Sequence, residues 1–334
     1  MSSGSSIDGV LVQWGDRLFY PANRVLKSAV TPRLDTGIRQ RAAVIRQRLT
    51  ATVARRAPQV MVKVTGGGRG MAAIAAHLRY ISKNGRLAFE DDRGIAREGK
   101  EALHDLVNQW RFGGSLIEEL GHRREAFNLM LSMPCGTDAQ LLLKAVREFA
   151  RTELSGHRYA MVLHEHQANP HVHLSVRAES MRGERLSPRK ADLHRWRETF
   201  AEKLRGWGID AEATRQATRG ANRHFDPLWR LKARAEGRLR SAGSPVKDGE
   251  AYHASRRGAV EAWSHLMDAL EASPLPDDRQ LAAGIARFVR DSAFIREEMQ
   301  RRRIREAALS RDHRTNPELT RTRSVDRSGP QRGR

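Results

Sequence analysis

The chain has a single cysteine, Cys135, among its 334 residues. No disulfide can therefore form within it, and we expect a reducing, cytoplasmic setting in which Cys135 is a buried apolar filler. The sequence also lacks a signal-peptide-like apolar segment and any apolar run long enough to span a bilayer. These absences argue against a disulfide-stapled, secreted or membrane-inserted protein.

Acidic residues are scarce relative to basic ones. Asp and Glu number 39 against 60 Lys and Arg, which gives a formal net charge of +21. An imbalance of this size favours a polyanionic partner, most readily nucleic acid, over a passive basic surface. At 334 residues the chain is long enough to fold as one large domain or two small ones.

Histidines, by contrast, are concentrated: four of the thirteen fall between His164 and His173. Successive side chains of a strand alternate between its faces, so His171 and His173 should share one face while the apolar residues between and beyond them face the core. The β-rich run from Arg158 and the turn-forming residues after His164 predict a hairpin that brings His164 beside the other two. Three imidazoles with open positions describe a catalytic metal site. The alternative is a solvated histidine-rich turn.

The rest of the sequence predicts strands and helices around this hairpin. Residues 1–57 are a basic extension in which we place no core, although a short cationic helix is expected over residues 39–56. Further strands are expected over 59–64 and 124–133, a polar loop over 89–94, and helices over 71–82, 98–110, 137–154, 192–204, 250–272 and 277–308. Residues 310–334 have almost no apolar side chains and should be disordered.

Two stretches suit phosphate or base binding, each with an ordinary alternative. The glycine-rich turn at residues 66–70 allows close backbone approach to a phosphate, but it serves equally as a tight strand-to-helix turn. It lacks the Gly-Lys-Ser/Thr ending of a P-loop, so ATP binding is rejected. Residues 215–240 interleave arginines such as Arg219 and Arg223 with aromatics. This composition fits base stacking, or a solvated helical face with its aromatics in the core.

A metal beside a basic surface favours phosphodiester chemistry, with either water or a tyrosine as the nucleophile. Only four tyrosines are present. Tyr159 should face the core of its strand, and Tyr20 and Tyr252 lie in peripheral segments. Tyr80, on the predicted helix over 71–82, is the remaining candidate. Its alternative role is to pack at the edge of the core.

Two motifs resemble those of a known family. His164-x-x-x-x-x-Pro170-His171-Val-His173 resembles the histidine motif of the HUH single-strand nucleases. Leu78-Arg-Tyr80-Ile-Ser-Lys-Asn-Gly-Arg-Leu87 resembles the tyrosine motif of the VirD2-like, MobA-type conjugative relaxases. The likeness covers residues 58–235. It implies an α/β (α+β) relaxase fold with a mostly antiparallel central sheet flanked by helices, preceded by the extension over 1–57 and followed by a helical appendage over 236–309 and the basic tail over 310–334.

The resemblance also implies an activity. A relaxase nicks one strand at an origin of transfer, with Tyr80 forming a 5′-phosphotyrosine, and later rejoins the strand. The three histidines would hold Mg²⁺ or Mn²⁺, with Zn²⁺ as a further possibility. The expected partners are single-stranded and origin-of-transfer DNA, relaxosome accessory proteins and a type IV coupling protein, for a cytoplasmic bacterial protein that is exported bound to its DNA. DNA contacts are assigned to Arg69, Lys83, Arg86, Arg189, Lys190, Arg219 and Arg223.

One position departs from the family pattern. Relaxases commonly place Asp two residues after the first histidine, where this chain has His166. An acid there would orient a ligand imidazole. Glu165, Asp91 and Asp92 are the candidates to replace it, and the sequence does not choose among them. Two other functions stay open: a zinc hydrolase without a covalent intermediate, and a non-catalytic DNA-binding accessory protein.

Overall fold

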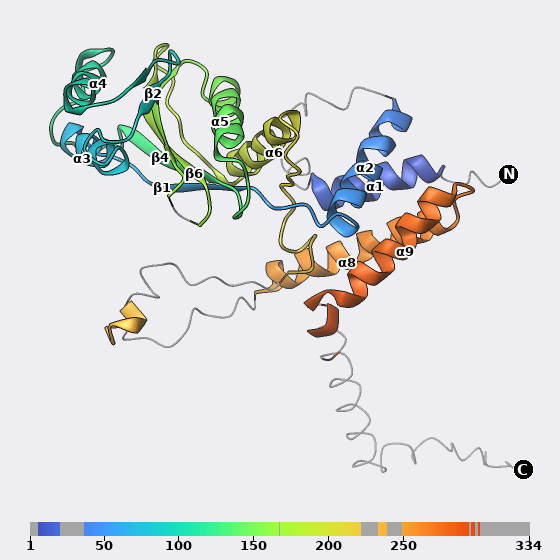
Figure 1. Cartoon of the computed structure of the whole chain (residues 1–334). Helices are drawn as coiled ribbons and strands as arrows, with labels where there is room; N and C mark the ends of the chain where they lie inside the picture. The colour runs from blue at the N-terminus through green and yellow to red at the C-terminus, as the bar shows by residue number, and fades with distance from the viewer. Residues whose placement is uncertain are drawn as a thin grey trace, which may run out of the picture. The chain divides into compact units, whose positions relative to one another are not determined.

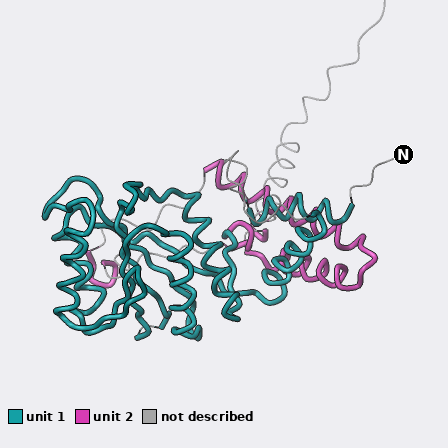
Figure 2. Tube along the Cα trace, turned by 90° about the horizontal axis from the view of Figure 1, so that it is seen from above, with its two compact units in different colours: residues 1–215 teal, residues 216–334 magenta. Residues whose placement is uncertain are grey.

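The computed structural model describes residues 6–20, 37–166, 168–221, 233–238, 249–293, 295–297 and 300. The chain divides into two compact units, residues 1–215 and 216–334, which are described separately (Figure 2). The tail predicted to be disordered lies outside the described residues, and the predicted domain boundaries at 57/58 and 235/236 stay predictions. Within the described ranges, no helix combines the length and apolarity that a bilayer crossing requires.

A six-stranded sheet organises the first unit (Figure 1). Its strand order is β1-β4-β6-β5-β2-β3, and every neighbouring pair is antiparallel. The strands are β1 (Met61–Gly66), β2 (Phe89–Asp91), β3 (Ala96–Arg97), β4 (Ala126–Ser132), β5 (His157–His164) and β6 (His171–Ser180). This confirms the predicted mixed fold with a mostly antiparallel sheet. Of residues 89–94, predicted to be a polar loop, the first three instead form strand β2, and residues 92–94 form the turn after it.

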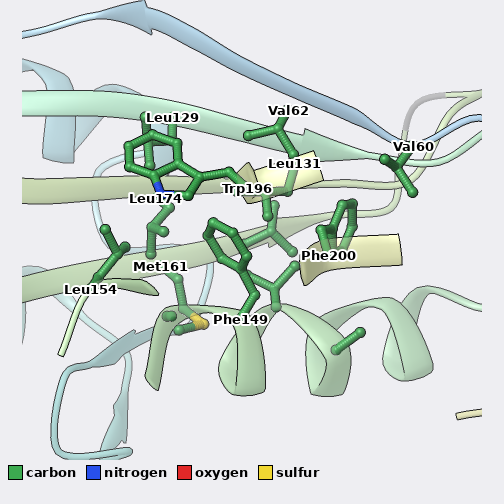
Figure 3. Packing of buried hydrophobic residues seen from close by; sticks show 14 of the residues in the cluster. Val60, Val62, Leu129, Leu131, Phe149, Leu154, Met161, Leu174, Trp196 and Phe200 are labelled. Atoms are coloured by element: carbon green, nitrogen blue, oxygen red, sulfur yellow. The ribbon is translucent and has the colours of Figure 1, made fainter. Parts of the chain in front are cut away.

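Helices cover both faces of the sheet (Figure 1). One face carries α3 (Met71–Ile81) and α4 (Lys100–Phe112), and the other carries α5 (Ala139–Glu153) and α6 (Lys190–Gly206). The core under α5 and α6 is the larger of the two (Figure 3). In it the ring of Phe149 packs edge-on against Trp196 and Phe200, each at 6.3 Å between centroids. Such pairs add about 0.5–1.5 kcal/mol beyond the area they bury.

The alternation of β6 determines which face holds chemistry. Val172, Leu174 and Val176 are fully buried in the core under α5 and α6. His171 and His173 therefore project from the opposite face, as predicted, toward the side that carries α3. On β5, Tyr159 is buried in the same core as the valines, which confirms that it faces away from the histidines.

The N-terminal segment forms two packed helices, α1 (Ile7–Phe19) and α2 (Ile38–Val53). The prediction that this segment holds no core is wrong, because Leu11, Leu18 and Leu49 are almost completely buried. Helix α2 was predicted from the sequence, whereas α1 was not. The signal for α1 was present as Ser6, whose side chain accepts the Gly9 N–H as an N-cap, followed by apolar residues at helical spacing.

Cys135 is exposed and is not the buried filler that we expected. It lies in the turn after β4, between Pro134 and Gly136, where the chain leaves the sheet for α5. Its backbone N–H donates to Asn169 Oδ1 at 2.9 Å, so the turn is held against the end of the β5–β6 hairpin. Because this turn lies at the surface, the Cys135 side chain is not part of the core.

The second unit contains the helices α8 (Glu250–Glu271) and α9 (Pro276–Asp291), which pack on each other. Trp263, Leu266 and Ile285 are buried between them and the segment before them. The Trp263 indole N–H donates to Thr218 O at 2.9 Å, which ties α8 to that segment. Of the predicted helix over 277–308, residues 294, 298, 299 and 301–308 lie outside the described residues.

Candidate metal centre and the tyrosine helix

The β5–β6 hairpin brings the three predicted histidines together. His164 pairs directly with His171, and His173 lies opposite Val162, so all three side chains leave the same face of the sheet. Their ring centroids are 4.7–5.1 Å apart. One nitrogen from each ring lies within 4.8 Å of the others, a spacing that could hold a metal ion. We call these residues the histidine triad.

Two backbone carbonyls orient the triad. His164 Nε2 lies 2.7 Å from Ile81 O, and His171 Nδ1 lies 3.0 Å from Asn169 O. A carbonyl oxygen only accepts, so each of these nitrogens must carry the proton and donate it. The lone pair is then left on His164 Nδ1 and on His171 Nε2. Outer hydrogen bonds of this kind are the usual way in which metal-ligating imidazoles are held.

Burial keeps His164 and His173 uncharged at neutral pH. Burial, together with repulsion from the adjacent His164 and His171, lowers the pKa of His173 to about 3. Burial likewise lowers the pKa of His164. His173 Nδ1 is buried and has no hydrogen-bond partner among the described residues. Neutral imidazoles with available lone pairs are what a divalent cation requires, so the donor set fits a metal.

Helix α3 carries Tyr80 to this site. Ile74, Leu78 and Ile81 form its buried stripe, and Tyr80 lies outside that stripe in the last turn. The Tyr80 side chain is 74% exposed, so it does not pack at the edge of the core. The carbonyl that accepts from His164 belongs to Ile81, the next residue. The end of the tyrosine helix is thus bonded to the triad.

His77, which the sequence motifs do not include, lies near both Tyr80 and His173. Its ring centroid is 6.4 Å from that of Tyr80 and 6.4 Å from that of His173. Burial lowers its pKa, and its Nε2 is buried without a hydrogen-bond partner in the described ranges. The signal was its spacing, because a residue three positions before Tyr80 shares its helix face.

The turn after α3 fixes the approach to the site. Lys83, Asn84 and Gly85 all have positive φ angles, of 49°, 58° and 81°. A Cβ on Gly85 would lie 2.6 Å from the backbone of Gly99, so only glycine fits there. The turn leaves Lys83 exposed, and its charge helps to lower the pKa of His164. Arg86 is also exposed in this turn.

Residues 80–209 match the family described as relaxase, MobA/VirD2-like, nuclease domain. These residues form a MobA/VirD2-like relaxase domain. The matched range begins at Tyr80 and contains the whole histidine triad. A relaxase domain indicates DNA binding and DNA nicking, which agrees with the net charge of +21. A search of curated proteins finds no match.

The glycine-rich turn at residues 66–70, which precedes the matched range, is structural. The first N–H groups of α3, at Met71 and Ala72, donate to Glu118 O and Glu119 O at 2.9 and 3.1 Å. A Cβ on Gly70, whose φ is +156°, would lie 2.5 Å from Glu119 O. The helix N-terminus is therefore occupied by backbone, which favours the tight-turn alternative over phosphate binding.

The acids considered as substitutes for the family aspartate are placed differently. Asp91 is buried and ion-paired with Arg93 and Arg97 at 2.7 and 3.6 Å. It lies opposite Ala160, four residues along β5 from His164, or about 13 Å at the rise of a strand. Asp92 follows Asp91, and its pKa is raised by burial. The structure does not bring either acid to the triad.

Near the triad, the remaining candidates are exposed. Glu165 and His166 follow β5 directly, and the His166 ring centroid is 5.2 Å from that of His164. The orienting bond that the family aspartate would supply is not missing, because His164 Nε2 already donates to Ile81 O. The substitution at position 166 thus leaves the orientation of His164 intact.

The residues assigned to DNA contact are dispersed. Lys83 and Arg86 lie beside the tyrosine helix, and Arg69 is exposed in the turn before it. Arg189 and Lys190 are exposed at the start of α6, which covers the sheet face away from the triad. Arg219 belongs to the second unit, and Arg223 lies outside the described residues.

Proposed function

We propose that this protein is a conjugative relaxase that nicks one DNA strand at an origin of transfer through Tyr80 and later rejoins it. The observation that carries the proposal is the hydrogen bond from His164 to Ile81 O at 2.7 Å. It joins a side chain of the triad to Ile81, the residue next to Tyr80. In the described part of the relaxase domain, Tyr80 is the tyrosine that is exposed.

The chemistry is an exchange of phosphodiesters. The Tyr80 hydroxyl oxygen attacks the scissile phosphorus, the bond from phosphorus to the 3′ oxygen breaks, and the departing oxygen takes a proton to become a free 3′-hydroxyl. The product is a 5′-phosphotyrosine, which stores the ester bond so that a 3′-hydroxyl can reverse the attack and reseal the strand. A divalent metal held by the triad supplies Lewis-acid stabilisation of the phosphate charge.

The residues of this chain supply placement and polarity. Tyr80 is exposed, so a single strand can reach its hydroxyl without opening the core. The hydroxyl proton must leave during the attack. His77 places an uncharged imidazole on the same helix face. Exposed Lys83 and Arg86 add positive charge where the strand would lie.

The metal proposed is Mg²⁺ or Mn²⁺. A triad made entirely of imidazole nitrogen favours Mn²⁺ of the two, because Mg²⁺ prefers oxygen ligands. The same donor set suits Zn²⁺, and this observation keeps the zinc hydrolase as a second candidate. That enzyme would release cleaved DNA with no protein attached.

The proposed partners follow from the same reading. They are single-stranded and origin-of-transfer DNA, relaxosome accessory proteins and a type IV coupling protein that would receive the protein with its attached strand. The positive charge of the chain supports the DNA partner.

A matched pair of tyrosine variants tests the nucleophile. Tyr80→Phe removes only an exposed hydroxyl, whereas Tyr159→Phe removes a buried one that faces the other side of the sheet. With Mn²⁺ and a labelled single strand that spans the nick site, wild type and Tyr159→Phe should form a covalent adduct on a denaturing gel, and Tyr80→Phe should form none. An adduct with Tyr80→Phe would refute the assignment. Cleavage without any adduct would favour the zinc hydrolase, and binding without cleavage would favour the accessory protein.

A further inference from the structure

A polar cavity lies on the same sheet face as the triad, at the other end of the central strands. It has a volume of about 280 Å³ and is lined by Gly113, Gly114, Ser115, Arg158, Arg177, Glu179, Ser180 and Met181. Arg177 is four residues along β6 from His173, or about 13 Å at the rise of a strand. We call this cavity the arginine pocket.

A β-bulge brings the two arginines of the pocket together. The pairing of β5 with β6 shifts between His157 and Tyr159, so that Arg158 lies at the irregularity. Bulges change the direction in which a side chain points, and they occur often beside functional sites. Burial is the main cause that lowers the pKa of Arg177. Among the nearby charges, Glu179 raises that pKa, and Arg158 is close enough to lower it. Two like charges at one place favour an anion between or beside them.

Arg177 is already committed to the fold. Its guanidinium donates to Trp110 O and Gly113 O at 3.1 and 3.2 Å, and to the backbone carbonyl and hydroxyl of Ser115. These bonds satisfy the carbonyls at the C-terminal end of α4. Arg177 therefore contributes charge to the pocket, but not free donors.

Arg158 differs from Arg177 in this respect. It makes no hydrogen bond or ion pair within the described ranges, and its Nε is buried without a partner. Next to its guanidinium, a Cβ on Gly113 would come within 3.1 Å, so the glycine keeps that space open. A second donor faces the same cavity. Ser180 Oγ accepts the N–H groups of Arg182 and Glu184, which leaves its own hydroxyl hydrogen to donate.

The negative charges of the acidic residues near the pocket are offset by neighbouring arginines. Glu179 pairs with Arg185 and Arg123 at 3.3 and 3.8 Å and accepts from Ser115, and these contacts lower its pKa. Asp92 interacts with Arg158 by charge without reaching ion-pair distance. Around the pocket the arginines are Arg123, Arg158, Arg177 and Arg185, against the carboxylates Asp92, Glu125 and Glu179. Positive charge is thus in excess, and the free donors belong to Arg158 and Ser180.

We propose that the arginine pocket binds a phosphate group of the DNA backbone, at a point removed from the nick. The inference rests on the proposed function, since it takes DNA as the ligand. A guanidinium matches two phosphate oxygens with parallel N–H donors, and this geometry is the reason that arginine with unused donors suits a phosphate. Because the site reads backbone and not bases, it anchors a strand without selecting its sequence.

The main test compares two arginine variants that lose the same charge. Arg158→Gln empties the pocket of its free guanidinium, whereas Arg182→Gln removes an exposed arginine beside it that does not line the cavity. Binding to labelled single strands of increasing length is measured by fluorescence anisotropy over a range of salt. Arg158→Gln should bind long strands about tenfold more weakly and reduce the salt slope by about 0.7, and it should match wild type on strands too short to reach the pocket. Arg182→Gln should stay within about twofold of wild type at every length.

A second pair of variants guards against misfolding of Arg158→Gln. Met181 is 70% exposed at the cavity, so its replacement leaves the core untouched. Met181→Glu adds a negative charge at the pocket, and Met181→Gln is the control of equal size. The glutamate variant should lose affinity for long strands relative to the glutamine variant. Equal affinity within both pairs would overturn the proposal.

Free phosphate is the other source of the same group. If inorganic phosphate raises the melting temperature of wild type but not of Arg158→Gln, while both bind long strands equally, the pocket takes free phosphate and the DNA assignment is overturned. If wild type forms no adduct but its binding still depends on Arg158, the proposed function fails and the pocket assignment stands.

Discussion

Replacement of Arg48 should lower the free energy of unfolding of the first unit strongly. It lies on α2 with its side chain 7% exposed, and its guanidinium pairs with Glu198 and Glu212, each at 3.0 Å. The same guanidinium lies over the rings of Phe19 and Tyr20, at 4.7 and 4.9 Å from their centroids. One cation thus joins the N-terminal helices to α6 and to the segment after it. We expect Arg48→Met to loosen that junction.

The loss of stability arises because Glu212 stays buried after its partner Arg48 is removed. The Glu212 side chain is 3% exposed, and in Arg48→Met its remaining cation is Arg205 at 3.7 Å. Removing one member of a buried ion pair typically costs about 3–5 kcal/mol, because the other charge stays buried and uncompensated. For a unit of this size each 1 kcal/mol lowers the melting temperature by about 2–4 °C. The expected fall is therefore about 6–20 °C.

The assay is thermal and urea unfolding, both followed by circular dichroism, with two matched variants. Arg55→Met breaks the neighbouring pair with Asp210, whose side chains are 54% and 38% exposed, and should cost less than about 1 kcal/mol. The double variant Arg48→Met, Glu212→Gln should recover part of the loss, because the stranded charge is gone. If Arg48→Met lies within about 1 kcal/mol of wild type, the reasoning about this junction is refuted.

Three further predictions concern histidines. His173→Ala should weaken Mn²⁺ binding, measured by calorimetry, at least about 100-fold, because replacing a residue that merely hydrogen-bonds to a metal ligand already costs about 10–100-fold. The control His166→Ala, at an exposed position, should change the affinity less than about threefold. Equal losses in the two variants would contradict metal binding by the triad. Nicking at equal concentration should be faster with Mn²⁺ than with Mg²⁺, and the reverse order would count against an all-nitrogen site. Burial lowers the pKa of His194, so this side chain binds fewer protons in the native state than in the unfolded chain. The free energy of unfolding should therefore fall as the pH drops below about 6.5. The urea midpoints at pH 7.5 and 5.5 should differ less in His194→Gln than in wild type.

The central hairpin could be predicted because its pattern is local. The alternation of valine and histidine along β6 assigns two faces, and one turn brings His164 back to His171. The sequence alone could not show whether the Tyr80 side chain is exposed or packs at the edge of the core. Helical spacing leaves the burial of a residue beside the apolar stripe ambiguous. Its 74% exposure decides the matter.

Other features depend on contacts between distant residues or on very short elements. Strands β2 and β3 have only three and two residues, too few for a period to be visible. No local sequence pattern shows that Arg48 pairs with Glu198 and Glu212, which lie 150 and 164 positions away. For this reason the sequence alone predicts an N-terminal extension without a core. The commitment of Asp91 to Arg93 and Arg97 is likewise a property of the folded turn.

The most direct test of the account is to find the atom to which DNA becomes attached. Wild-type protein is incubated with Mn²⁺ and a single strand that spans the nick site and traps the intermediate, then digested, and the adduct is mapped by mass spectrometry. The account predicts a phosphodiester on the Tyr80 oxygen, carried by the peptide that ends α3. Attachment at any other residue, or cleavage that leaves no residue modified, would contradict it.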